Sequence, residues 1–144
     1  MRNMLLTSAI ALTAALSSPA LARPMTEVDL ATLKRVAAPT ASPDGRWVVF
    51  QQTDTEQQSY KRSTGLWLID RNAKDAKPVQ IADVAGKNET SPAFAPDGSL
   101  YFLSNASGKD QIWRIDLTAG TAATQVTNTP ADVSGFKISP DGKK

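Results

Sequence analysis

A four-residue phrase occurs three times along this chain, and its spacing strongly limits the folds that are available. Its copies are Ser42-Pro43-Asp44-Gly45, Ala95-Pro96-Asp97-Gly98 and Ser139-Pro140-Asp141-Gly142, separated by 53 and then 44 residues. The first two copies are each followed by a second shared phrase, Leu66-Trp67-Leu68-Ile69-Asp70 or Ile112-Trp113-Arg114-Ile115-Asp116. Repeats of about 40 to 50 residues are typical of β-propeller blades. The sequence therefore predicts an all-β fold made of β-propeller blades.

The first phrase has the composition of a tight turn. Proline presets φ at one turn position, aspartate bonds nearby backbone N–H groups, and glycine adopts the left-handed conformation. A calcium site is the alternative, but it needs several oxygen ligands close together. Asp44, Asp97 and Asp141 have no acidic neighbour close in sequence. We therefore predict structural turns at these positions.

The second phrase places a tryptophan at the same position in two repeats. Trp67 and Trp113 are expected to pack within or between blades, with ligand stacking as the alternative. Asp70 and Asp116 end these strands and are expected to accept hydrogen bonds from the turns that follow.

Each blade is expected to be a four-stranded antiparallel meander. The predicted chain contains about two blades and the first strand of a third: blade 1 at about 39–82, blade 2 at about 89–127, and the start of blade 3 at about 132–144. Residues 47–50 and 100–103 are continuously apolar, which predicts strands covered on both faces. The remaining expected strands are 66–70, 79–81, 112–116, 123–126 and 133–138.

Residues 1–22 have the features of a signal peptide. Arg2 precedes the apolar run Met4–Leu16, and Ala20-Leu21-Ala22 has the small-x-small form of a cleavage site. The apolar run is shorter than the roughly 20 residues that span a bilayer. We therefore expect cleavage after Ala22, a periplasmic or secreted protein, and no membrane attachment afterwards.

Residues 23–38 are predicted to form a helical segment in front of the partial propeller, which occupies 39–144. Thr26 and Asp29 have the spacing of a capping box. Leu30, Leu33 and Val36 give an apolar stripe at helical spacing, so a helix over 26–36 is expected.

The composition excludes several classes of function. With 16 basic and 14 acidic residues interspersed, the chain has no basic stripe for nucleic acid. It contains no cysteine and no histidine, so neither a Ser-His-Asp triad nor a Cys-His pair can form within it. A Gly-x-Ser-x-Gly elbow is absent as well. No catalytic, cofactor-binding or metal-binding residue is therefore predicted in this sequence.

The polar stretch 53–64 is the longest departure from the repeat, and it is predicted to be a loop. Such loops line propeller entrances or contact a second domain. Its chemistry-bearing residues are Asp54, Glu56, Tyr60, Lys61 and Arg62. Two sequences of the glycosylation type, at 88–90 and 105–107, are expected to be coincidental in a bacterial protein.

The opening of the predicted mature chain resembles a known family. Residues 25–50 resemble the start of bacterial prolyl oligopeptidase family serine peptidases, including dipeptidyl aminopeptidase and acylaminoacyl-peptidase types. Residues 94–120 look like the general propeller repeat that TolB-like proteins share. The residues that carry the first resemblance are Asp29, Leu30, Leu33, Val36, Pro39 and 42–45.

This resemblance implies a propeller that caps an α/β-hydrolase domain, with the Ser-Asp-His triad in the C-terminal part of the protein. None of those catalytic positions lies in this sequence. The paired-glutamate motif that anchors a peptide amino terminus in dipeptidyl peptidases is also absent, because Glu56 and Glu89 are isolated.

The resulting hypothesis is the N-terminal propeller portion of an exported serine peptidase. Its partners would be the C-terminal hydrolase domain of the full-length protein and peptide substrates admitted by the propeller. A non-enzymatic TolB-like propeller acting through protein–protein contacts is one alternative. A truncated product, whose two open sheet edges would favour association, is another.

Overall fold

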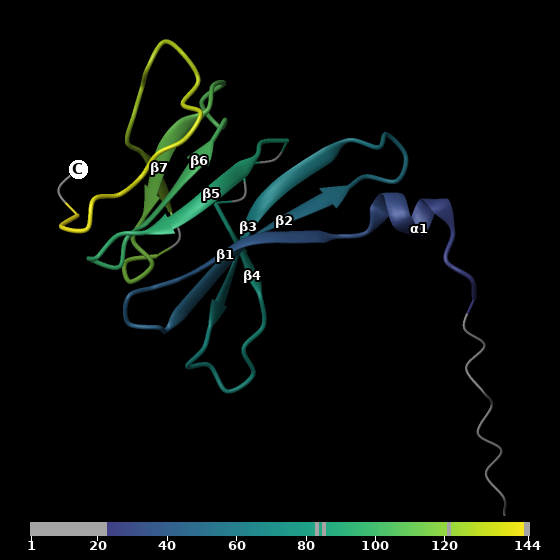
Figure 1. Cartoon of the computed structure of the whole chain (residues 1–144), viewed down its shortest axis with the longest axis horizontal. Helices are drawn as coiled ribbons and strands as arrows, with labels where there is room; N and C mark the ends of the chain where they lie inside the picture. The colour runs from purple at the N-terminus through teal and green to yellow at the C-terminus, as the bar shows by residue number, and fades with distance from the viewer. Residues whose placement is uncertain (1–22, 83, 85, 121, 143–144) are drawn as a thin grey trace, which may run out of the picture.

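The computed structural model describes residues 23–82, 84, 86–120 and 122–142. The predicted signal peptide therefore lies outside the described residues. In these described residues, one helix and eight strands follow one another (Figure 1). Within the described part of the chain, no helix is both long and apolar enough to cross a membrane. The elements are α1 (Glu27–Thr32), β1 (Arg35–Ala41), β2 (Trp47–Thr55), β3 (Arg62–Asp70), β4 (Val79–Ile81), β5 (Glu89–Phe94), β6 (Leu100–Ser104), β7 (Gln111–Ile115) and β8 (Ala123–Gln125).

The strands form two separate four-stranded sheets, ordered β1-β2-β3-β4 and β5-β6-β7-β8. Every neighbouring pair is antiparallel. Each sheet is thus a meander in which strands adjacent in sequence are adjacent in space. This confirms the predicted all-β class and the two four-stranded meanders.

The two sheets share one hydrophobic core. β5 lies against β1, β2 and β3, so the second sheet packs on the first (Figure 1). Burial of these aliphatic and aromatic side chains is the main force holding the sheets together. Both sheets contribute to the core: Val49, Leu66, Leu68 and Ile81 come from the first, and Leu100, Phe102 and Ile115 from the second.

The two tryptophans occupy matching positions in their sheets. Trp67 lies opposite Phe50 on one side and Gln80 on the other, whereas Trp113 lies opposite Phe102 and Gln125. Each tryptophan is therefore flanked by a phenylalanine and a glutamine on the same sheet face. The predicted equivalence of the two repeats is confirmed at this level.

Both tryptophans also point in the same direction, from the second sheet toward the first and beyond it. Trp113 shares its face with Leu100 and Ile115 and packs against the core between the sheets. Trp67 alternates with Leu66 and Leu68, which face that core, so it points away from the second sheet. The ammonium of Lys34 lies 5.9 Å from the centre of the Trp67 ring.

The prediction that both faces of the strand after each turn are buried is right for β6 and wrong for β2. Most of β6 is buried, but in β2 only Val49 is buried. The physical reason is that the face carrying Phe50 and Trp67 has no second sheet packed on it among the described residues. Phe50 also follows Asp44 by six residues, whereas Phe102 follows Asp97 by five, so the strands after the two turns are offset by one residue.

The three Pro-Asp-Gly phrases form turns, as predicted. In each, the glycine has a positive φ of 71°, 85° or 67° and its N–H bonds the carbonyl three residues earlier at 2.8 to 2.9 Å. The aspartate side chains close these turns locally. Asp44 accepts from the Ser42 hydroxyl at 2.5 Å, Asp97 from the Ser99 N–H at 2.9 Å, and Asp141 from the Ser139 hydroxyl at 2.6 Å.

Both first strands contain a β-bulge that sequence reasoning missed. The register of β1 shifts between Ala37 and Thr40, and that of β5 shifts between Thr90 and Ala93. Ala38 and Ser91 adopt positive φ angles of 47° and 55° within these bulges, and each precedes a proline. The bulge frees the Ser91 N–H to bond the Gln51 side chain of the first sheet at 2.6 Å, which couples the sheets.

Two predicted elements differ from the structure. The helix expected over 26–36 ends at Thr32, because the chain turns extended at Leu33 and Val36 then pairs with Gln52 in β1. The predicted capping box between Thr26 and Asp29 is present. The strand expected at 133–138 does not form, because no described strand lies beside it to share a hydrogen-bond ladder.

Candidate functional site

Half of the polar stretch 53–64 is hairpin strand, so the predicted loop is confirmed only for its central residues. β2 continues to Thr55, β3 begins at Arg62, and the connection between them is only residues 56–61. Thr53 lies opposite Thr64, and their hydroxyls are 2.9 Å apart. The β-branched threonines extend the ladder because their side chains suit a pleated surface. The extra residues of the first repeat therefore lengthen a hairpin.

The chemistry-bearing residues of this hairpin are not brought together. Asp54 lies one residue before the end of β2, 3.8 Å from the Lys34 ammonium. Glu56 accepts a hydrogen bond from the Ser59 hydroxyl within the tip. The tip contains no pocket-forming cluster, because its other polar residues, Tyr60, Lys61 and Arg62, are exposed.

A buried carboxylate lies at the base of the same hairpin. Glu89 opens β5 and is only 2% exposed. It lines a small recess of about 80 Å³ with Asp54, Gly65 and Gln80. A Cβ on Gly65 would lie 3.9 Å from a Glu89 oxygen and 2.9 Å from the side-chain nitrogen of the exposed Gln80, so Gly65 lies directly against the recess. Sequence reasoning treated Glu89 as isolated, because its neighbours come from strands far away in the chain.

Asn88 joins the two sheets near this recess, and Asn105, which follows β6, binds the Asn88 backbone. The Asn88 side-chain oxygen accepts from the Thr64 N–H at 2.9 Å, and the Asn88 N–H donates to the Asn105 side-chain oxygen at 2.9 Å. Both amides of the two glycosylation-type sequences thus hold backbone in place, which gives these asparagines a structural role.

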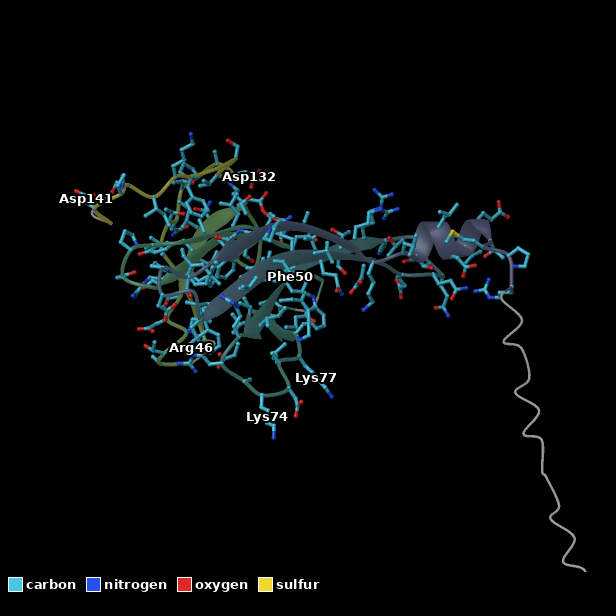
Figure 2. All side chains as sticks on the ribbon, turned by 60° about the horizontal axis from the view of Figure 1, so that its bottom comes forward. Arg46, Phe50, Lys74, Lys77, Asp132 and Asp141 are labelled. Atoms are coloured by element: carbon cyan, nitrogen blue, oxygen red, sulfur yellow. The ribbon has the colours of Figure 1, made fainter. Side chains whose placement is uncertain are left out.

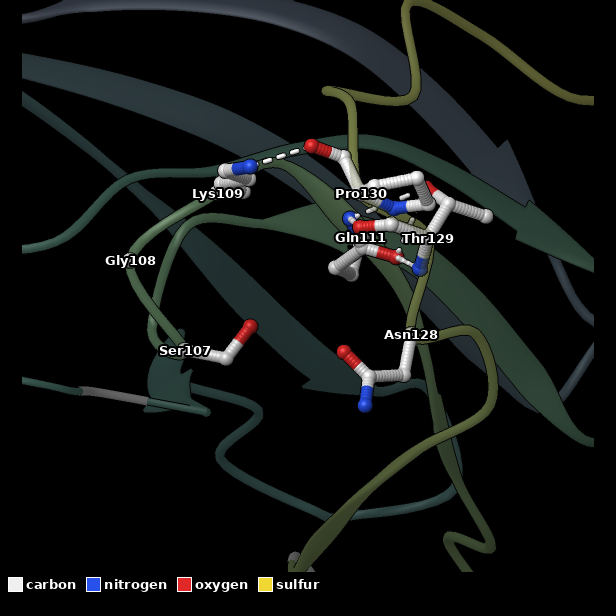
Figure 3. Close-up of a pocket in the computed structure, with 7 residues that line it drawn as sticks. All are labelled: Ser107, Gly108, Lys109, Gln111, Asn128, Thr129 and Pro130. Atoms are coloured by element: carbon white, nitrogen blue, oxygen red, sulfur yellow. Dashed lines mark hydrogen bonds between the residues drawn. The ribbon is translucent and has the colours of Figure 1, made fainter.

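A larger polar pocket lies beside the hairpin between β6 and β7 (Figure 3). Its volume is about 500 Å³, within the range of small-molecule sites. One wall is the hairpin turn and the other is the segment that follows β8. The lining residues are Ser107, Gly108, Lys109, Gln111, Asn128, Thr129 and Pro130.

Gln111 fixes the wall of this pocket. Its side chain is 2% exposed and bonds to three residues of the segment after β8. The side-chain nitrogen donates to the Thr129 and Ala131 carbonyls at 3.3 and 3.1 Å. The side-chain oxygen accepts from the Thr127 hydroxyl at 2.9 Å and the Thr129 N–H at 3.0 Å. A buried amide with all of these partners makes the wall rigid.

The carboxylates with lowered pKa values serve turns, except for Asp29, whose pKa is lowered by Arg23 and Thr26 where it caps α1. The Ser42 hydroxyl and the Arg46 N–H lower the pKa of Asp44. The guanidinium of Arg46 lowers the pKa of Asp70, which it contacts at 2.9 Å. Thr118 lowers the pKa of Asp116 through its hydroxyl and its N–H. Asp70 and Asp116 also accept backbone bonds from the following turns at 3.0 Å, which confirms their predicted role.

These turns lie at the end of the sheets remote from the pocket. Figure 2 shows Arg46 at this end, with Lys74 and Lys77 on the nearby loop between β3 and β4. Among the described residues, no group of three or more His, Cys, Asp or Glu side chains is placed to hold a metal ion.

Comparison with known proteins gives the chain a functional context. No protein family model matches it. It is 27% identical over 120 residues to the uncharacterized peptidase YuxL of Bacillus subtilis, covering 83% of this chain. It is 29% identical over 121 residues to dipeptidyl-peptidase 5 of Porphyromonas endodontalis, again over 83% of this chain, and 29% identical over 114 residues to dipeptidyl-peptidase 5 of Porphyromonas gingivalis, over 78%. The chain is similar to peptidases.

The match covers only a small part of each relative. The chain spans 18%, 17% and 16% of the length of these three peptidases. The similarity therefore concerns a peptidase-related segment of two β-meanders, and most of each relative has no counterpart in it.

Proposed function

We propose that this chain forms two consecutive blades of a β-propeller in an exported serine peptidase of the prolyl oligopeptidase type. The observation that carries the proposal is the stacking of two meanders in which Trp67 and Trp113 hold the same register and point the same way along the stack. Successive blades of a propeller likewise repeat one four-stranded unit beside the next, in the same orientation about a central axis. The similarity to peptidases supports the proposal that these blades belong to a peptidase.

The role of these blades would be to control access to an active site and not to hydrolyse the peptide bond. The sequence contains no histidine and no nucleophile elbow, so the acid–base chemistry of a serine peptidase needs residues from elsewhere. An α/β-hydrolase domain would supply them, in keeping with the small share of each relative that this chain covers. The propeller would then admit short peptides and exclude folded proteins.

Export is part of the proposal. The basic start, the apolar run and the Ala20-Leu21-Ala22 sequence support cleavage after Ala22 and a periplasmic or secreted location. Fractionation of cells expressing the chain, followed by mass spectrometry of its N-terminus, tests this directly. A mature product starting at Arg23 in the periplasm or medium is expected, and an uncleaved cytoplasmic product would contradict it.

The peptidase assignment is tested by reading the gene beyond Lys144 and expressing its full product. We expect a Gly-x-Ser-x-Gly elbow followed by Asp and His, and turnover of a fluorogenic dipeptidyl substrate that is lost when the elbow serine is changed to alanine. The 144-residue chain alone is expected to be inactive. A reading frame that ends with the propeller, or turnover by this chain alone, would refute the proposal.

A further inference from the structure

The polar pocket between the β6–β7 hairpin and the segment after β8 contains polar groups that the fold does not use. Ser107 and Asn128 point toward one another across the pocket (Figure 3). Within the described part of the chain, neither side chain makes a hydrogen bond. The pocket therefore offers two unused polar side chains that can either donate or accept a hydrogen bond.

The pocket also has one cation at its rim. The Lys109 ammonium donates to the Pro130 carbonyl across the opening (Figure 3). An ammonium has three N–H donors, so two remain for a bound group. No Asp or Glu belongs to the lining of this pocket. Asp132 lies farther along the same segment, and one of its carboxylate oxygens accepts from the Asp110 N–H at 2.9 Å.

The pocket is preorganised. Gln111 ties the segment 127–131 to β7 through its buried amide, as described above. Lys109 joins the same segment to the hairpin turn. Bonds of this kind hold the backbone of the two walls together, which lowers the entropy lost on binding.

We propose that this pocket binds a carboxylate group of a peptide. One ammonium, a hydroxyl and a carboxamide, with no competing acid in the lining, match a group that carries one negative charge and accepts several hydrogen bonds. Lys109 would supply the charge, and the Asn128 amide and the Ser107 hydroxyl would donate to the two carboxylate oxygens. The choice of a peptide as the source of the carboxylate rests on the proposed function.

The experiment uses nuclear magnetic resonance of the ¹⁵N-labelled 144-residue chain titrated with acetyl-Ala-Ala. A second titration uses the same peptide as its C-terminal amide, and a third uses acetyl-Asp-amide, which carries a carboxylate only on its side chain. Shifts of the amide signals at residues 107–109, 128 and 129 are expected with the free acid and not with the uncharged amide. Binding of acetyl-Asp-amide would identify a side-chain carboxylate as an acceptable source.

Matched variants test the roles of the named groups. Lys109→Met and Asn128→Ala are each expected to weaken binding by about tenfold, the effect of one charge-assisted hydrogen bond. Lys109→Arg is expected to retain binding, because it keeps the charge and the donors. Lys74→Met serves as the control, since Lys74 lies on the β3–β4 loop, away from the pocket (Figure 2). Circular dichroism and thermal melting show whether each variant is folded.

Three results would overturn the proposal. The first is equal binding of the acid and the amide peptides, and the second is an absence of shifts at the pocket in the unmodified chain. The third is unchanged affinity in a folded Lys109→Met variant. All of these measurements are independent of peptide hydrolysis. A failure here would thus leave the peptidase assignment standing, and an inactive full-length product would leave carboxylate binding standing.

Discussion

Replacing each repeat tryptophan by phenylalanine tests whether the two sheets stack as successive units. Trp113→Phe alters a side chain between the sheets, whereas Trp67→Phe alters its counterpart on the outer face of the first sheet. The substitutions are chemically identical and lie at the same register position. Any difference between them therefore reports the surroundings of the two tryptophans.

The expected magnitude for Trp113→Phe has two parts. The Trp113 indole N–H donates to the Ser104 carbonyl at 3.2 Å, and losing this bond is expected to reduce stability by about 1 kcal/mol. The smaller phenyl ring buries roughly 40 Å² less apolar surface than the indole, which reduces stability by about 1 kcal/mol at 25 cal/mol per Å². The total is about 2 kcal/mol of the free energy of unfolding, a large share of the stability of a small domain.

Trp67→Phe is expected to change the free energy of unfolding by less than about 0.5 kcal/mol. Its indole makes no hydrogen bond within the described residues, and a phenyl ring keeps a face for the Lys34 ammonium. Urea unfolding followed by far-ultraviolet circular dichroism measures both variants, with equal denaturant slopes as the condition for comparison. If Trp67→Phe destabilises the chain as much as Trp113→Phe, the stacking direction deduced here is wrong.

Three further predictions concern single contacts and pH. Gly65→Ala should change the free energy of unfolding by less than about 0.5 kcal/mol, as should Gly135→Ala, because the Cβ at position 65 would meet only the far end of the exposed Gln80 side chain at 2.9 Å, which can move aside. A clear drop in melting temperature for Gly65→Ala alone would contradict this. Gln111→Ala should lower the free energy of unfolding by about 2 to 3 kcal/mol, since it removes several hydrogen bonds, each worth about 1 kcal/mol, between a buried side chain and the segment after β8, and an unchanged urea midpoint would contradict this. The pKa values of Asp44, Asp70 and Asp116 are lowered by folding, so their stabilisation is present above the ordinary pKa of about 3.8 and is lost as pH falls below it. Asp70→Asn should therefore flatten the decline of melting temperature with acid, and a parallel decline would argue against the Arg46 ion pair.

The sequence predicted the meanders because their signals are local and repeated. The Pro-Asp-Gly turns depend on φ angles and on side-chain bonds that span two or three residues. The strand phrases after them likewise carry their own β-propensity. The fold class and the order of the strands could be predicted from such signals. They hold even though β2 and β6 are offset by one residue relative to the turns that precede them.

Features that depend on distant partners could not be predicted in this way. The burial of Glu89 arises because Gly65 and Gln80, from other strands, close around it. The pocket beside Ser107 and Asn128 joins segments some twenty residues apart through Gln111. The bulges did have a sequence signal, because Ala38-Pro39 and Ser91-Pro92 each lie six residues before a turn aspartate. That signal could be interpreted as a bulge only once the strand register was known.

The bulged first strands have a consequence for the behaviour of the chain in solution. β1 and β5 are outermost in their sheets, yet each is kinked at Ala38 or Ser91 and then loses an amide donor at Pro39 or Pro92. The opposite margins, β4 and β8, are only three residues long. A strand from another molecule would find an interrupted hydrogen-bond ladder at β1 or β5 and a very short one at β4 or β8. None of the four edge strands is therefore a good template for fibre growth. Even without neighbouring repeats, pairing of further strands at these four margins should be disfavoured.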